Sequence, residues 1–270
     1  MKLSLLIPVL NQEETLHETV QRLREVLAGH DVEILVVFDV TKPELREDVE
    51  RLRRALADQF DVRSLVRLDE RGFGSALRHA AKHATGEVLM PIMADLSDDV
   101  AIIPAMLQKI ADEADVVVGA RYVEGGRIVG DTPKQRLSRF YTRLMGALTT
   151  IKCGDVSNSF KMYRKEVWEA VHPRAQSFDL SVELTVKAAS LGYRIDQVPA
   201  TWVNRQAGRS NFRTPDELWH YGRWLAFAML RLPSRWVIAA GLGLPLLVRR
   251  ALWRGSPVRA RHPSETVLGR

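Results

Sequence analysis

Short apolar runs alternate with amphipathic stretches through the first 120 residues of the chain. Runs rich in Val, Leu and Ile predict buried strands at residues 3–9, 33–38, 62–68, 88–93 and 115–119. Apolar positions at helical spacing predict helices between them, at residues 15–28, 43–58, 74–83 and 102–111. This alternation predicts an α/β fold with a mostly parallel central sheet flanked by helices.

Polar segments follow three of the predicted strands, at residues 8–14, 39–43 and 94–99. In open parallel sheets, ligands bind beyond the carboxyl ends of the strands, where such segments meet. We therefore expect the three segments to converge on one binding site.

The regular alternation ends after residue 125. A glycine-containing loop leads to a predicted basic helix at 135–149, then to another helix at 178–191 and a last strand at 193–203. Beyond residue 212 the chain is aromatic and apolar with interspersed arginines, and an uncharged run of twelve residues occupies 237–248. We therefore predict a main domain at 1–213, a helical hairpin at 214–252 and a basic tail at 253–270.

The uncharged run is shorter than the roughly 20 residues that a membrane-spanning helix needs. Trp236, Trp253 and several arginines flank it, which is typical of a segment at the headgroup level of an anionic membrane surface. The alternative is a C-terminal hairpin that packs on the domain or on a second subunit of a homo-oligomer.

The net charge of +6 belongs to the C-terminal region. Residues 231–270 carry a net charge of +7, which leaves −1 for residues 1–230. The arginines lie beside apolar runs and not among isolated stacking aromatics, so we expect no nucleic-acid partner. Cys153 is the single cysteine, and the first apolar run leads into acidic residues without a small-residue cleavage site. These features predict a cytoplasmic protein, peripherally associated with the cytosolic face of the membrane.

An ordered series of motifs resembles the family 2 glycosyltransferases. It consists of Leu5–Glu14, Glu33–Asp39, residues 71–99, Gly119–Tyr122, Asp155–Arg164, Pro199–Trp202 and Gly208–Ser210. Within that family the chain is most similar to the dolichyl-phosphate or polyprenyl-phosphate mannosyl- and glucosyltransferases. The resemblance covers about residues 3–213 and implies a nucleotide-sugar transferase domain of the GT-A type.

The resemblance implies a nucleotide-sugar donor, of the GDP-mannose or UDP-glucose type, at the ends of the first strands. The donor-binding residues would be Pro8, Asn11, Glu13, Asp39, Arg71 and Asp95. An ordinary strand-ending turn is the alternative for Pro8 and Asn11. Gly72-Phe73-Gly74 lacks the third glycine of a dinucleotide fingerprint, so we interpret it as a loop near the donor diphosphate.

Asp95 corresponds to the last acid of the family's Asp-x-Asp signature, which holds Mg²⁺ or Mn²⁺ against the donor diphosphate. The chain departs from this signature because Met93 stands where the first acid belongs. Either Asp95 would then hold the metal with Asp98 or Asp99 and the diphosphate oxygens, or the metal would be held weakly. We assign the metal site to Asp95 and Asp98. The alternative is that Asp98 and Asp99 cap the helix that follows.

The resemblance further implies inverting transfer of a hexose to a polyprenyl phosphate, an acceptor that needs little deprotonation. The site must supply positive charge to hold this phosphate. The matching residues are Arg121, Arg136 and Arg205, together with the hydroxyl of Ser210. Asp155 and Glu183 are candidates for a base or for positioning the donor sugar, and a surface salt bridge is the alternative for Glu183. Another lipid, glycan or metabolite acceptor, or a non-catalytic sugar-nucleotide-binding scaffold at the membrane, are the rival functions.

Overall fold

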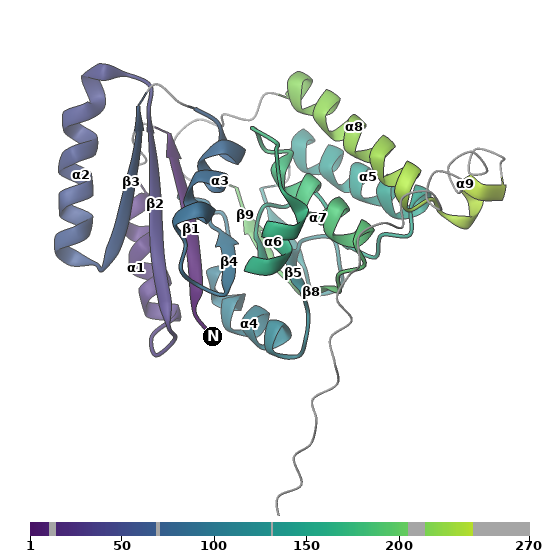
Figure 1. Cartoon of the computed structure of the whole chain (residues 1–270), viewed down its shortest axis with the longest axis horizontal. Helices are drawn as coiled ribbons and strands as arrows, with labels where there is room; N and C mark the ends of the chain where they lie inside the picture. The colour runs from purple at the N-terminus through teal and green to yellow at the C-terminus, as the bar shows by residue number, and fades with distance from the viewer. Residues whose placement is uncertain (11–14, 69–70, 131, 205–213, 240–270) are drawn as a thin grey trace, which may run out of the picture.

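The computed structural model describes residues 1–10, 15–68, 71–130, 132–204 and 214–239 (Figure 1). Its main sheet has seven strands in the order β3-β2-β1-β4-β7-β5-β8. The strands are β1 (Leu3–Leu10), β2 (Val32–Val40), β3 (Val62–Leu68), β4 (Val88–Pro91), β5 (Val116–Ala120), β7 (Lys161–Arg164) and β8 (Ile195–Pro199). All neighbouring strands pair in parallel except β7, which is antiparallel to both β4 and β5. The predicted mostly parallel sheet is therefore confirmed.

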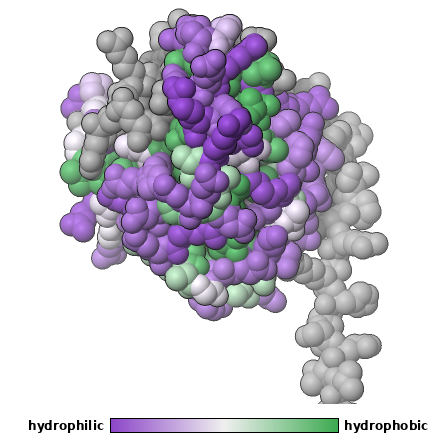
Figure 2. Space-filling view, turned by 90° about the vertical axis from the view of Figure 1, so that its left-hand side faces the viewer, coloured by the Kyte–Doolittle hydropathy of each residue, from purple (hydrophilic) through white to green (hydrophobic). Residues whose placement is uncertain are grey.

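Helices cover both faces of the sheet because the strands are apolar on both sides. In β1, Leu5 and Ile7 point into one core together with α1 (Leu16–Val26), α2 (Arg46–Gln59) and α4 (Ile103–Ala111). Leu6 points into the opposite core, which contains α3 (Phe73–His83), α6 (Lys165–Val171) and α7 (Leu180–Ser190). The outer surface at the β3 and α2 end of the sheet is mostly hydrophilic (Figure 2).

A third cluster lies beside the sheet and joins three helices. It packs α7 against α5 (Pro133–Leu148) and α8 (Thr214–Arg231), with Met145, Val182 and Ala228 fully buried. Figure 1 shows α5, α7 and α8 grouped on the side of the molecule away from α2. A short helix, α9 (Arg235–Ala239), follows α8. None of the described helices has the length and apolar character needed to cross a bilayer.

The structure differs from the predicted elements in several places, and the short helix α6 is among the elements that were not predicted. Strand β7 was not predicted, because its four residues include Lys161 and Arg164 and show no strand pattern. The predicted strand at 193–203 is two strands: β8 joins the main sheet, whereas β9 (Thr201–Val203) pairs with β6 (Arg127–Val129) in a small second sheet. Strand β4 ends at Pro91, so residues 92 and 93 belong to the loop that follows.

Candidate active site

The loop after β4 is held by hydrogen bonds from the start of α1 and from β9. The carbonyl oxygen of Ala94 accepts a hydrogen bond from the hydroxyl of Thr15 at 2.5 Å, at the start of α1. The carbonyl oxygen of Ser97 accepts one from the backbone N–H of Val203 in β9, at 3.2 Å. Within the loop, Asp95 is 5% exposed and its Oδ1 accepts from the backbone N–H of Ser97 at 3.1 Å. These contacts hold the Asp95 carboxylate at the carboxyl edge of the sheet.

Two further carboxylates, Asp98 and Asp99, lie in the same loop. Asp98 Oδ2 accepts from the backbone N–H of Met93 at 2.9 Å, and Asp99 Oδ2 accepts from that of Thr201 at 3.0 Å. Asp99 precedes the short helix at Val100–Ile102 without a side-chain capping bond, so it does not cap that helix. Burial raises the pKa of Asp98 to about 7, and the charges of Asp95 and Asp99 act in the same direction. A cation would relieve this mutual repulsion.

Asp39, at the carboxyl end of β2, forms a buried ion pair. Its two carboxylate oxygens accept from Nε and a terminal nitrogen of Arg67, both at 2.6 Å, and both side chains are at most 5% exposed. Arg67 also donates to the hydroxyl of Ser75 at 3.1 Å, and that hydroxyl donates to the carbonyl of Gly72. This chain of bonds connects β2 and β3 to the start of α3.

The start of α3 packs tightly against the segment that precedes α7. A Cβ atom at Gly72 would lie 2.7 Å from the carbonyl oxygen of Gln176, and Gly72 has φ of +137°. The N–H of Gly74 donates to the same carbonyl at 2.9 Å. The rings of Phe73 and Phe178 stack with centroids 4.7 Å apart. The glycines of Gly72-Phe73-Gly74 are therefore required for close backbone packing, and the exposed Arg71 precedes them.

Arg121 and Asp155 form the second buried ion pair of the site. The guanidinium of Arg121 donates to Asp155 Oδ2 at 2.6 Å and to Oδ1 at 3.0 Å, and the Arg121 backbone N–H also donates to Oδ2. The N–H of Asn158 donates to Oδ1 at 3.2 Å. The Asp155 side chain is fully buried, and that of Arg121 is 9% exposed. The sequence-predicted acceptor arginine and candidate base are thus bound to each other.

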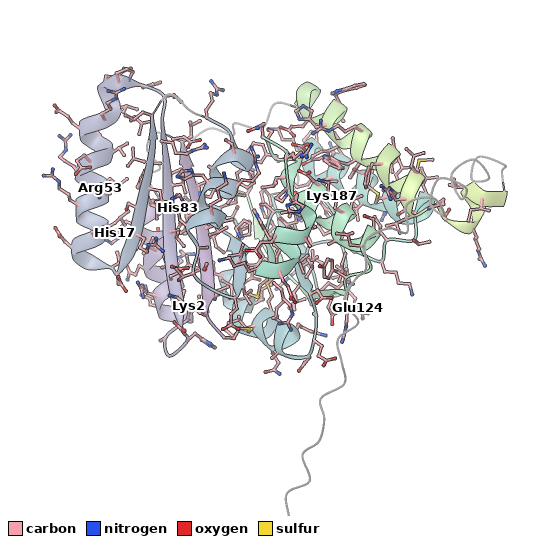
Figure 3. All side chains as sticks on the ribbon, in the orientation of Figure 1. Lys2, His17, Arg53, His83, Glu124 and Lys187 are labelled. Atoms are coloured by element: carbon pink, nitrogen blue, oxygen red, sulfur yellow. The ribbon has the colours of Figure 1, made fainter. Side chains whose placement is uncertain are left out.

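Glu183 in α7 is also fully engaged as a hydrogen-bond acceptor. Its carboxylate accepts from the backbone N–H groups of Arg174 and Ala175, at distances between 2.7 and 3.0 Å. Lys187, labelled in Figure 3, donates to it from the next turn of α7 at 2.5 Å. The Glu183 side chain is 1% exposed. The pair with Lys187 therefore joins a buried carboxylate to a partly buried ammonium group and differs from the surface salt bridge considered as the alternative.

The remaining predicted site residues divide into two groups. Pro8 lies in β1 opposite Val37 of β2, and Arg136 is exposed on α5. Asn11, Glu13, Arg205 and Ser210 lie outside the described residues.

Sequence reasoning missed Arg67. It lies directly opposite Asp39 in the register of β2 and β3. The available signal was a charged residue inside a predicted buried strand, because a buried charge requires a partner.

Comparison with protein families decides the class of this site. Residues 4–171 match the family described as Glycosyl transferase family 2. The chain belongs to glycosyltransferase family 2. This family 2 chain is 29% identical to the dolichol-phosphate mannosyltransferase of Pyrococcus furiosus over 216 residues, which cover 79% of the chain and 60% of that relative. It is 30% identical to the undecaprenyl-phosphate mannosyltransferase of Micrococcus luteus, with 78% of the chain and 87% of that relative covered.

Solved structures place this family 2 enzyme among GT-A-like folds. A glucosyl-3-phosphoglycerate synthase from Mycobacterium tuberculosis, in complex with Mn²⁺, uridine diphosphate and phosphoglyceric acid, superposes with a TM-score of 0.60. The match has 20% sequence identity and covers 87% of this chain and 80% of the synthase. The chain is therefore a member of glycosyltransferase family 2 with a GT-A-like fold.

Proposed function

We propose that the chain transfers a hexose, with inversion, from a nucleotide-sugar to a polyprenyl phosphate. The observation that carries this proposal is that both candidate bases already accept hydrogen bonds within the protein. Asp155 and Glu183 are buried, and each accepts several hydrogen bonds from the protein. Neither is positioned to take a proton from an acceptor hydroxyl. A phosphate acceptor is already ionised, so its oxygen attacks the anomeric carbon without such a base.

The relatives favour particular substrates within this scheme. The Pyrococcus furiosus and Micrococcus luteus proteins are named as mannosyltransferases of dolichol phosphate and undecaprenyl phosphate. Mannose as the sugar and a polyprenyl phosphate as the acceptor are therefore our first choices, with GDP-mannose ahead of UDP-glucose as donor.

The loop after β4 fits a divalent cation. Asp95 and Asp98 offer hard oxygen ligands. The pKa of Asp98 is raised mainly by burial and further by the charges of Asp95 and Asp99, which a cation would offset. We propose that Asp95 and Asp98 hold Mg²⁺ or Mn²⁺. When bound, the ion would supply positive charge to the departing nucleotide diphosphate.

The chain's own residues would supply orientation. In this proposal Pro8, Asn11, Glu13 and Asp39 lie along the donor base and ribose, and Arg71 contacts the diphosphate. The pair between Asp39 and Arg67 supports the start of α3. Arg136, Arg205 and Ser210 bind the acceptor phosphate. In the same proposal Arg121, held by Asp155, contributes a rigidly oriented guanidinium to phosphate binding.

A surface beside this site suits a lipid-borne acceptor. Phe140 on α5 is 62% exposed and Trp219 on α8 is 75% exposed. The two helices touch where the Tyr141 hydroxyl donates to the backbone carbonyl of Tyr221 at 2.9 Å. Helix α5 contains Lys134, Arg136, Arg139 and Arg143 and no acid. Exposed aromatic side chains together with basic residues and no acids are typical of a surface that binds anionic membranes. We propose that role for the exposed side chains of α5 and α8.

The test is release of nucleotide diphosphate by the purified full chain. GDP-mannose, UDP-glucose and UDP-N-acetylglucosamine are supplied in turn, with polyprenyl phosphate, with phosphoglyceric acid or with no acceptor, in Mg²⁺ or Mn²⁺. We expect release from GDP-mannose that requires the polyprenyl phosphate, and a mannosyl lipid by mass spectrometry. Release that requires phosphoglyceric acid instead would replace the lipid with a soluble phosphate acceptor. Transfer only to hydroxyl acceptors would overturn the argument from the engaged carboxylates.

A further inference from the structure

A second group of ligand-type side chains lies between α7 and α8, on different elements from Asp95. Asp179 immediately precedes α7, and Glu217 and His220 lie one turn apart on α8. One ligand atom from each of the three lies within 4.8 Å of the others. His220 Nδ1 is 3.8 Å from Asp179 Oδ1 and 3.9 Å from Glu217 Oε2, which is too long for a hydrogen bond.

Each carboxylate in this group has one oxygen that accepts hydrogen bonds from the protein and one oxygen that accepts none among the described residues. Asp179 Oδ2 accepts from Trp224 Nε1 and from Arg223, both at 2.9 Å. Glu217 Oε1 accepts from the hydroxyl of Ser177. The other oxygens, Asp179 Oδ1 and Glu217 Oε2, are buried without a hydrogen-bond partner among the described residues, and so is His220 Nδ1.

Burial makes these three unpartnered atoms costly. Asp179 is fully buried and Glu217 is 3% exposed. A buried polar atom without a partner costs about 1–3 kcal/mol, and more when it is charged. Three such atoms that face one another are the pattern expected where a bound ion supplies the missing partner. The bonds from Trp224, Arg223 and Ser177 correspond to the outer contacts that orient metal ligands.

We propose that Asp179, Glu217 and His220 bind a divalent transition-metal ion of the zinc class. One imidazole nitrogen with two carboxylate oxygens suits Zn²⁺ better than Mg²⁺, which prefers oxygen alone. Ligand atoms around a tetrahedral ion with bonds of about 2.1 Å lie about 3.4 Å apart. The separations of 3.8 and 3.9 Å thus need a contraction of about half an ångström. The His220 side chain is one-third exposed, which gives the ion a route of entry.

The ion would connect two parts of the enzyme. Helix α8 directly follows residues 205–213, which include the proposed acceptor residues Arg205 and Ser210. The segment before Asp179 packs on the start of α3 through Gln176 and Phe178. An ion at Asp179, Glu217 and His220 would therefore fix the first turns of α8 to the segment that supports α3, as a structural clamp.

The test measures metal binding without reference to activity. Untagged full chain is treated with chelator and desalted, then titrated with Zn²⁺ by calorimetry and with Co²⁺ by visible absorption. The Asp95→Asn variant serves as background, so that the proposed catalytic ion does not contribute. We expect one ion per chain, a Co²⁺ spectrum of low coordination number and a rise in melting temperature, because the ion binds only the folded state.

Two substitutions and a matched control locate the ion. His220→Gln and Glu217→Gln each keep the size of the side chain, and we expect each to weaken Zn²⁺ binding about tenfold or more. His30→Gln removes an exposed histidine elsewhere and should leave binding unchanged. Absence of a tight Zn²⁺ or Co²⁺ equivalent, or equal binding by the His220→Gln and His30→Gln variants, would overturn the proposal. Neither result would bear on the transferase reaction.

Discussion

At the scale of single residues, the site is dominated by carboxylates that already have partners. Asp39 is paired with Arg67, and Asp155 with Arg121, in bidentate contacts that are almost fully removed from water. A buried pair contributes little net stability, but removal of one partner leaves an uncompensated charge. These acids therefore hold cationic side chains in fixed positions, whereas we propose that Asp95 and Asp98 bind the ion.

Asp155→Asn should destabilise the fold strongly, because Arg121 then remains buried without a counter-charge. We expect a loss of about 3–5 kcal/mol in the free energy of unfolding, measured by urea denaturation. Asp196→Asn is the control: its pair with Lys109 is partly exposed, so its loss should be below about 1 kcal/mol. Equal losses in the two variants would contradict the buried-pair interpretation.

Asp95→Asn should reduce sugar transfer about 100-fold while the protein stays folded, because the proposed ion loses a charged ligand. Initial rates over a range of Mn²⁺ concentrations measure the effect, and part of the rate should return at high Mn²⁺. Asp112→Asn, at an exposed position after α4, is the matched control. Unchanged transfer by the Asp95→Asn variant would refute the metal assignment.

At the scale of elements, the carboxyl and amino ends of the parallel strands have different roles. We propose that the loops at the carboxyl ends of β1, β2 and β4 bind the donor. The amino end of β2 is fixed to its neighbours by Glu33. Its carboxylate accepts from the hydroxyl of Ser4 in β1, from Arg63 in β3 and from the backbone N–H groups of Thr85 and Gly86. Glu33 thus connects three strands and the turn before β4.

The Glu33 contacts predict a pH-dependent contribution to stability. Burial would raise the pKa of Glu33, but the hydrogen bonds from Ser4, Thr85 and Arg63 outweigh it and lower the pKa from 4.5 to about 2. A lowered folded-state pKa stabilises the protein fully above pH 4.5, and that contribution disappears as the pH falls toward 2. Glu33→Gln should therefore cost about 2–3 kcal/mol at pH 7 and clearly less at pH 3.5.

Urea unfolding at the two pH values measures this difference. Glu50→Gln is the control, since Glu50 pairs with Arg53 and Arg54 on the surface of α2, where solvent screens the interaction. We expect little change from Glu50→Gln at either pH. A Glu33→Gln cost that does not change with pH would show that packing, and not the charge, is responsible.

At the scale of the whole molecule, two parts of the surface differ in character. The β3 and α2 end is mostly hydrophilic (Figure 2). Helices α5 and α8 lie on the other side of the molecule (Figure 1) and carry exposed aromatic and cationic side chains. On α8, Trp219, Arg223 and Leu230 recur at helical spacing on one exposed face. In our proposal, the polyprenyl phosphate reaches the enzyme from the bilayer on this side.

Replacement of Phe140 and Trp219 together by serine should weaken binding to vesicles of phosphatidylglycerol and phosphatidylcholine about tenfold or more, because two partly inserted rings are lost. Co-sedimentation at two salt concentrations measures it, and higher salt should weaken binding by the parent protein too. The control replaces Val66 and Leu68, exposed apolar residues of the edge strand β3. Equal effects of the two double variants, or no binding by the parent, would contradict a membrane-facing α5 and α8.

The sequence by itself determined the strand and helix alternation, the parallel sheet and the family, because periodicity and ordered motifs are local properties of the chain. It also singled out Asp95 and Asp98 as candidate metal ligands and the segment 72–74 as a loop. Only the tertiary structure decided which charges meet. Asp39 with Arg67, Arg121 with Asp155 and the group of Asp179, Glu217 and His220 join residues from separate elements. The antiparallel β7 was equally hidden, since strand pairing depends on neighbours that come together only in the folded chain.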